Sequence, residues 1–206
     1  MTLREEQVAI APWIRDGSRV LDLGCGDGAL LSHLARTRGV TGYGIEIDEA
    51  KILSCLAAGV NVLQSDLNRG LADFDDNSFD YVVMTQTLQA MRFPHLLLRE
   101  MLRVGREAIV TFPNFGNWKC RLQILAGRMP VTRHLPSTWY DTPNIHMCTL
   151  RDFEALCAQE GFEVLQREVL DNEHRATSLM HLMPNLLAEV ALYRFRRATA
   201  GQHRTA

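Results

Sequence analysis

The sequence has no apolar run long enough to form a transmembrane helix, which requires about 20 residues. Residues 1–6 are polar and then acidic, whereas a secretory signal begins with basic and then strongly apolar residues. The charge is nearly balanced, with 22 basic and 24 acidic residues and a formal net charge of −2. The lack of a basic excess argues against nucleic acid or an anionic membrane as a partner. We therefore expect a soluble, cytoplasmic protein.

Cysteine and histidine lack the spacings of a disulfide framework or a metal site. The five cysteines are scattered and form no CxxC pair, and none of the seven histidines belongs to an HExxH motif. An odd, dispersed set of cysteines is typical of free thiols in a reducing compartment. The sequence therefore predicts no bound metal.

Strands alternate with helices along residues 8–112, and no internal repeat or low-complexity segment occurs. This alternation is typical of right-handed βαβ units around a buried parallel sheet. With 206 residues and 47% hydrophobic content, the chain is long enough for one well-buried domain, which we expect to span residues 1–206. The expected strands are Arg19–Leu23, Val40–Ile47, Val60–Gln64, Phe79–Thr85 and Glu107–Phe112, and the expected helices are Val8–Ile14, Ala29–Arg36, Glu49–Ala58 and His95–Val104.

The alternation is interrupted after Pro113. Residues 114–148 contain three prolines and two of the three tryptophans and show little periodicity, apart from a possible helix at Trp118–Leu125. We interpret residues 114–148 as an insertion that covers the side where a ligand and its reaction partner would bind.

Regular structure returns at Thr149. Thr149 and Asp152 form a capping-box pattern ahead of a helix at Leu150–Gln159. The pattern then predicts two closing strands, which would form an antiparallel edge pair, at Phe162–Val169 and Leu187–Phe195. Residues 186–193 also fit a helix. The predicted fold is α/β and Rossmann-like, a mostly parallel sheet with an antiparallel C-terminal edge strand and helices on both faces.

The strongest local motif is the glycine-rich segment at residues 22–28, Asp-Leu-Gly-Cys-Gly-Asp-Gly, which follows a strand and opens a helix. Glycines here allow unusual backbone angles and let the chain approach a ligand without an intervening Cβ. The helix that follows offers free N–H groups to a negative ligand group. Asp22 supplies an acceptor beside the glycines, where a ligand's amino group would sit.

Two ligand classes fit this loop. Gly24, Gly26 and Ala29 match the G-x-G-x-x-[GA] fingerprint of dinucleotide-binding proteins. Glu46, at the end of the second strand, would hold two ribose hydroxyls of either NAD or S-adenosylmethionine. The glycine loop alone therefore does not separate these ligands.

Three further features favour S-adenosylmethionine. A carboxylate at Asp22 would repel a pyrophosphate but suits an ammonium group, and Gly28 adds a third early glycine. Asp66, just after the third strand, would accept from the adenine amine while the N–H of Leu67 donates to the ring. The carboxyl ends of parallel strands share one sheet edge, where ligands of such folds bind. The expected cofactor-binding residues are Asp22, Gly24, Cys25, Gly26, Gly28, Glu46, Ile47, Asp66, Leu67, Thr85 and Gln86.

With these motifs, residues 8–112 resemble the class I S-adenosylmethionine-dependent methyltransferases. Later segments resemble the narrower MetW family of methionine biosynthesis proteins, through most of the chain: residues 85–91, 99–106, 112–118, 128–132 and 139–146. The resemblance implies S-adenosylmethionine or S-adenosylhomocysteine as ligand. It also implies a role in bacterial methionine synthesis with a homoserine O-acyltransferase of the MetX type as partner.

Two functions are compatible with this resemblance. In the first, the protein binds S-adenosylmethionine and docks on the acyltransferase to modulate it. In the second, it is a methyltransferase for a small-molecule acceptor. Methyl transfer needs mainly alignment and desolvation from the protein, and a base for some acceptors. The candidates are His146, Tyr140 and Gln89, each of which also has a purely structural interpretation, as a hydrogen-bonding or core residue.

Overall fold

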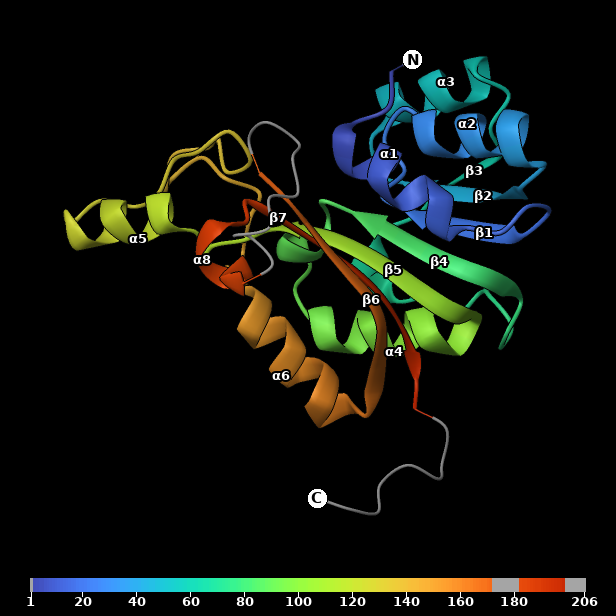
Figure 1. Cartoon of the computed structure of the whole chain (residues 1–206). Coiled ribbons are helices and arrows are strands. Elements are labelled where there is room, and N and C mark those ends of the chain that lie inside the picture. The colour runs from blue at the N-terminus through green and yellow to red at the C-terminus, as the bar shows by residue number, and fades with distance from the viewer. Residues whose placement is uncertain (1, 172–181, 199–206) are drawn as a thin grey trace.

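The computed structural model describes residues 2–171 and 182–198 and contains a seven-stranded sheet. The strand order is β3-β2-β1-β4-β5-β7-β6 (Figure 1). The strands are β1 Arg19–Leu23, β2 Thr41–Glu46, β3 Val62–Gln64, β4 Phe79–Thr85, β5 Gly105–Pro113, β6 Phe162–Leu170 and β7 Val190–Arg197.

The sheet is mostly parallel, as the sequence predicts. Strands β1 to β5 pair in parallel, whereas β7 pairs antiparallel with both β5 and β6. The expected antiparallel closing pair is therefore confirmed, with β6 at the sheet edge and β7 beside β5. The carboxyl ends of all five parallel strands therefore lie at the same edge of the sheet.

Helices cover both faces of the sheet (Figure 1). Helices α1, α2 and α3 lie on one face and α4 and α6 on the other, while α5 lies away from the sheet. The helices are α1 Glu5–Ile10, α2 Ala29–Arg38, α3 Glu49–Ala57, α4 Pro94–Val104, α5 Trp118–Leu125, α6 Leu150–Glu160 and α8 Pro184–Leu187, and the short 3₁₀ turns are Ala11–Trp13, Leu67–Arg69 and Leu88–Ala90. Within the described residues, no helix has the length and apolar character needed to cross a bilayer.

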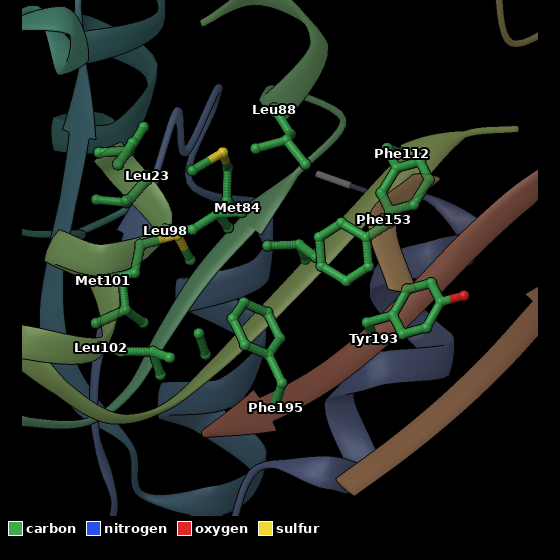
Figure 2. Close-up of a cluster of buried hydrophobic side chains, with 14 of the residues drawn as sticks. Leu23, Met84, Leu88, Leu98, Met101, Leu102, Phe112, Phe153, Tyr193 and Phe195 are labelled. Atoms are coloured by element: carbon green, nitrogen blue, oxygen red, sulfur yellow. The ribbon is translucent and has the colours of Figure 1, made fainter. Parts of the chain in front are cut away.

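Two hydrophobic clusters correspond to the two faces. One joins α4 and α6 to the sheet, and Figure 2 shows residues of this cluster, among them Leu98 and Met101 of α4, Phe153 of α6 and Tyr193 of β7. The Phe153 and Tyr193 rings are 4.7 Å apart. The second cluster contains the buried faces of α1 and α2 with Tyr81 of β4. Strands buried on both faces explain the nearly continuous apolar runs in the sequence.

The first helix begins and ends earlier than expected. The sequence predicts a helix at Val8–Ile14, whereas the α-helix spans Glu5–Ile10 and continues as a 3₁₀ turn at Ala11–Trp13. Pro12 lies in that turn. Because proline has no N–H and its ring clashes with the carbonyl four residues earlier, an α-helix cannot run unbroken through it.

The structure resolves the helix-or-strand ambiguity at residues 186–193. Pro184 begins the short helix α8, and Ala188 is already extended. The last strand then starts at Val190, three residues later than predicted, and pairs on both sides. The capping box of Thr149 and Asp152 is present as predicted.

Candidate functional site

The three acidic residues singled out by the sequence lie at the carboxyl edge of the sheet. Asp22 pairs with Gly44 of β2 and Val83 of β4, so it lies between these strands near their ends. Glu46 is the last residue of β2, and Asp66 follows β3 by two residues. The parallel topology therefore gathers carboxylates from three neighbouring strand ends.

The glycine-rich loop between β1 and α2 has the backbone conformation expected of it. Gly24, Gly26 and Gly28 have φ angles of 71°, 60° and 78°, which L side chains rarely adopt. A Cβ on Gly26 would meet no atom within 4 Å, so this glycine faces open space. A Cβ on Gly24 would lie 2.7 Å from Thr87 Oγ1, so this glycine allows the segment after β4 to approach.

Glu46 is buried and holds the glycine-rich loop. Its Oε2 accepts from the Gly26 N–H at 2.9 Å, and its Oε1 accepts from the N–H groups of Ile47 at 2.9 Å and Asp48 at 3.2 Å. Ile47 itself is 59% exposed. The carboxylate thus bridges the end of β2 and the loop, and its position is fixed by three backbone donors.

Asp22 is fully buried, and neither carboxylate oxygen has a hydrogen-bond partner among the described residues. Burial raises the pKa of Asp22 to about 7; the charge of Glu46 acts in the same direction, whereas the charge of Arg4 lowers it. An unsatisfied buried carboxylate is costly unless a cationic donor binds it. The site is therefore suited to a ligand ammonium group at Asp22.

Asp66 begins a 3₁₀ turn at the end of β3. Its Oδ1 accepts from the backbone N–H and the side-chain amide of Asn68, both at 2.9 Å, and these bonds lower its pKa. Asp66 is partly exposed, whereas Leu67 is buried. A carboxylate that stays ionised here can accept a hydrogen bond from an amine.

The segment after β4 carries further unsatisfied polar atoms. Gln86 has a φ of 53°, which is unusual for a residue other than glycine, and its Nε2 is buried without a partner. Gln89 donates from Nε2 to the Gln86 carbonyl at 2.9 Å, whereas its Oε1 is buried without a partner. The structure therefore brings Thr85, Gln86 and Gln89 to the same edge as Asp22, with hydrogen-bonding capacity left over.

Two predicted catalytic candidates lie apart from these atoms. His146 is exposed, and its Nε2 lies 3.3 Å from the Arg92 carbonyl. Only the backbone of its segment reaches the site, because the N–H groups of Ile145 and His146 both donate to the Gln89 carbonyl. Tyr140 is 74% exposed and lines a surface hollow with residues 127–129 and Trp139. Neither side chain is brought together with Asp22 or Glu46 by any described contact.

The structure adds residues that the sequence did not single out. Arg4 donates from Nη2 to Thr85 Oγ1 at 2.8 Å, although the two residues are 81 positions apart. A cavity of about 350 Å³ lies beside Gln86 and is lined by residues 3–6, Arg133 and His134. Burial lowers the pKa of His134, whose Nε2 lies 3.8 Å from Glu189. No local pattern marks Arg4 or His134, since their contacts join distant segments.

The thiol of Cys25 in the glycine-rich loop is buried. Its Sγ lies 3.8 Å from that of Cys55, and burial raises the pKa of both thiols. A protonated, buried thiol is a poor nucleophile, so Cys25 contributes shape to the loop. Within residues 2–171 and 182–198, no group of three or more histidine, cysteine or acidic residues is arranged to hold a metal ion.

Comparison with known proteins identifies the family. A family model described as methionine biosynthesis protein MetW matches residues 4–195. The chain belongs to the MetW family.

Two relatives illustrate how this MetW chain relates to longer proteins. The bifunctional methionine biosynthesis protein MetXA/MetW of Rhodopirellula baltica is 35% identical over 96% of this chain, which spans only 33% of that relative. A ubiquinone biosynthesis O-methyltransferase of Pseudomonas fluorescens is 30% identical over 66% of this chain and 60% of its own length.

Solved structures confirm the fold. An S-adenosylmethionine-dependent methyltransferase from Mesorhizobium loti superposes with a TM-score of 0.70 and 18% identity, over 94% of this chain and 98% of that one. The MetW chain therefore has the Rossmann-like methyltransferase fold. A fold of this kind hosts many activities, so the activity has to be argued from the site.

Proposed function

We propose that this MetW chain binds S-adenosylmethionine at the carboxyl edge of its sheet and acts with a homoserine O-acyltransferase of the MetX type in methionine biosynthesis. The proposed partner is supported by the Rhodopirellula baltica relative, a single chain whose name describes it as a bifunctional MetXA/MetW protein. In this proposal the chain works as one domain in which residues 114–148 are an insertion.

The arrangement of the site supports the ligand. Asp22 takes the α-ammonium group, because its buried oxygens lack hydrogen bonds that such a cation supplies. Glu46 takes the ribose hydroxyls, and Asp66 and the Leu67 N–H take the adenine edge. The open face of Gly26 lets the ligand approach the backbone. Thr85 and Gln86 contribute from the end of β4, and S-adenosylhomocysteine fits the same contacts.

Ligand and partner are thermodynamically linked in this proposal. If S-adenosylmethionine changes the affinity for the acyltransferase, then the acyltransferase changes the affinity for S-adenosylmethionine by the same factor. S-adenosylmethionine is made from methionine, the product of the pathway, so this linkage would let the pathway respond to its own output.

Copurification with the acyltransferase tests this function. The two proteins should associate, and titration of S-adenosylmethionine should change acyl transfer in their mixture. The Asp22→Asn chain is the matched control, and its mixture should not respond to the ligand. Absence of association together with an unchanged acyl-transfer rate would rule the proposal out.

A second candidate function is methyl transfer to a small molecule. The cavity beside Gln86 favours it, because that cavity adjoins the end of β4 and is lined by Arg4 and by His134, whose pKa is lowered by burial. Labelled S-adenosylmethionine, incubated with the protein and a metabolite extract, should then yield a labelled product. Cofactor binding without any labelled product would exclude methyl transfer to the molecules in the extract, and only the partner function would remain.

A further inference from the structure

Helix α5 projects from the rest of the molecule and carries apolar side chains on its surface (Figure 1). Of its eight residues, all of which the structure describes, only Cys120 is buried. Leu122 and Leu125 lie three positions apart on one side of the helix, and Leu125 is 84% exposed. A helix this short is at best marginally stable in water by itself, so α5 depends on packing against other groups.

Both ends of α5 are nevertheless held in place. The buried side chain of Asn117 caps the helix and donates to the carbonyls of Leu187 and Ala188, at 3.1 and 3.0 Å. Near the other end, the side chain of Gln123 accepts from the Val131 N–H at 3.0 Å and so joins α5 to the segment that follows it. A helix fixed in this way loses little freedom when a partner covers it.

The segment after α5 extends the apolar surface. Met129, Val131, Trp139 and Tyr140 are exposed and line one surface hollow of about 500 Å³. We call the exposed side chains of residues 122, 125, 129, 131, 139 and 140 the α5 face. Contiguous exposed apolar side chains with polar surroundings are typical of interaction sites in soluble proteins.

Basic side chains border the α5 face. Arg128 lines the same hollow, and Arg121 and Arg151 line a second hollow of about 320 Å³. All three are exposed, and within the described part of the chain none of them forms an ion pair. Glu154, which also lines the second hollow, is already paired with Arg167 at 2.9 Å. The bordering guanidinium groups are therefore available to an acidic partner.

The charge of this region is opposite in sign to that of the whole chain. Residues 114–148 contain four basic residues and one acidic residue, Asp141, although the chain has a formal net charge of −2. Two copies of the chain paired about a two-fold axis would bring the same arginines together. Because like charges across an interface oppose association, an acidic partner fits the α5 face better than a second copy does.

The Rhodopirellula baltica relative favours one such partner. Its match covers 96% of this chain and so includes most of residues 114–148, whereas this chain spans only 33% of that relative. In that protein, the remainder is tethered to the counterpart of the segment that forms the α5 face. Tethering raises the effective concentration of one part around the other, so a docking surface between them would be occupied readily.

We propose that the α5 face docks the homoserine O-acyltransferase of the MetX type, against an apolar patch bordered by acidic side chains on that enzyme. The inference rests on the proposed function and extends it, because it places the partner on residues distinct from the expected cofactor-binding residues. The apolar side chains supply most of the affinity, and the bordering arginines orient the partner and speed its association.

Calorimetry with the purified chain and the purified acyltransferase tests this inference. Leu125→Glu places a charge on the α5 face and should weaken association at least about tenfold. Leu53→Glu is the matched control, at a leucine that is 67% exposed on α3, and it should associate like the parent. Both variants should unfold in urea at the parent's midpoint, because each of these leucines is exposed.

Neutralisation of the bordering arginines tests the charge. Arg128→Gln and Arg151→Gln together should weaken association severalfold at low salt and reduce its dependence on salt concentration. Arg36→Gln, at an exposed arginine of α2 without an ion pair among the described residues, is the control and should leave both unchanged. An unaltered salt dependence in the double variant would contradict an acidic partner surface.

The outcomes separate this inference from the proposed function. If the parent associates with the acyltransferase and Leu125→Glu associates equally well, the inference is overturned while the proposed function stands. If the parent neither associates nor changes acyl transfer, the proposed function is overturned and the inference with it. If sedimentation shows a dimer of the chain alone that Leu125→Glu abolishes, a second copy covers the α5 face and the inference is overturned. Loss of association in Leu125→Glu but not in Leu53→Glu supports both.

Discussion

The Glu46 carboxylate accepts a hydrogen bond from the Gly26 N–H at 2.9 Å and so joins the end of β2 to the glycine-rich loop. The two residues are 20 positions apart, and the parallel pairing of β1 with β2 brings them together. A residue that the sequence predicts to bind a ribose therefore also shapes the loop. In the proposed site, ligand contact and loop geometry would depend on the same carboxylate.

Replacement of Glu46 should weaken S-adenosylmethionine binding. Glu46→Ala removes hydrogen bonds between a charged group and the ribose, and we expect a loss of about 1.5–3 kcal/mol in binding free energy, measured by calorimetry. Glu49→Ala, an exposed residue at the start of α3, is the matched control and should bind normally. Unchanged affinity in Glu46→Ala would mean that the ribose lies elsewhere.

Replacement of Asp22 should stabilise the ligand-free protein and weaken its binding of S-adenosylmethionine. Burial raises the pKa of Asp22 from 3.8 to about 7, so the folded state holds an extra proton between these pH values. The contribution of Asp22 to the free energy of unfolding therefore falls as the pH rises through this window. Asp22→Asn should remove this contribution and be more stable than the parent at pH 8, by up to about 4 kcal/mol.

Urea unfolding of the ligand-free proteins at pH 4 and pH 8 measures this difference. At pH 4 the parent and Asp22→Asn should be nearly equal in stability, because Asp22 is then protonated in the folded state. The parent's affinity for S-adenosylmethionine should rise as the pH increases from 5 to 7, where the ligand's ammonium group keeps its charge, while Asp22→Asn binds weakly throughout. A stability difference that does not vary with pH would contradict the assignment.

Two glycines with nearly the same φ angle allow strain to be separated from ligand contact. Gly26 and Gly39 have φ angles of 60° and 63°, and a Cβ on either would meet no atom within 4 Å. Alanine at either position should cost about 1–2 kcal/mol of stability, measured by urea unfolding. Only Gly26→Ala should also block S-adenosylmethionine, because Gly39 caps the far end of α2. Equal ligand affinity in both variants would place the ligand away from the loop.

The exposed aromatic pair Trp139 and Tyr140 should matter for the partner and not for the ligand. Each is 74% exposed, and their rings contact edge to face with centroids 5.5 Å apart. At many protein interfaces, exposed aromatic residues supply much of the binding energy, and their truncation to alanine removes it. We expect the double change to alanine to weaken acyltransferase association by about 2 kcal/mol or more and to leave S-adenosylmethionine affinity unchanged. Leu53→Ala, at an exposed position on α3, is the control, and an undiminished association would exclude this surface.

Elements set by local interactions were predictable from the sequence. The predicted bounds of β1, β4 and α5 agree with the structure, and the Thr149–Asp152 capping box is present. In each case the information lies in periodicity, caps or turns within a few residues. The gathering of Asp22, Glu46 and Asp66 at one edge also followed from sequence, because successive parallel strands end at the same side of a sheet.

Tertiary structure alone decided the features that join distant segments. The sequence could not place Arg4 against Thr85 or His134 beside Glu189, because no local pattern encodes contacts across 81 or 55 positions. It also left residues 186–193 ambiguous, since an apolar run of that length fits a helix or a strand. Only pairing with β5 and β6 on both sides selects the strand from Val190 onward. Local sequence thus determined most elements and the edge at which the three acidic residues gather, whereas packing determined which distant side chains join them there.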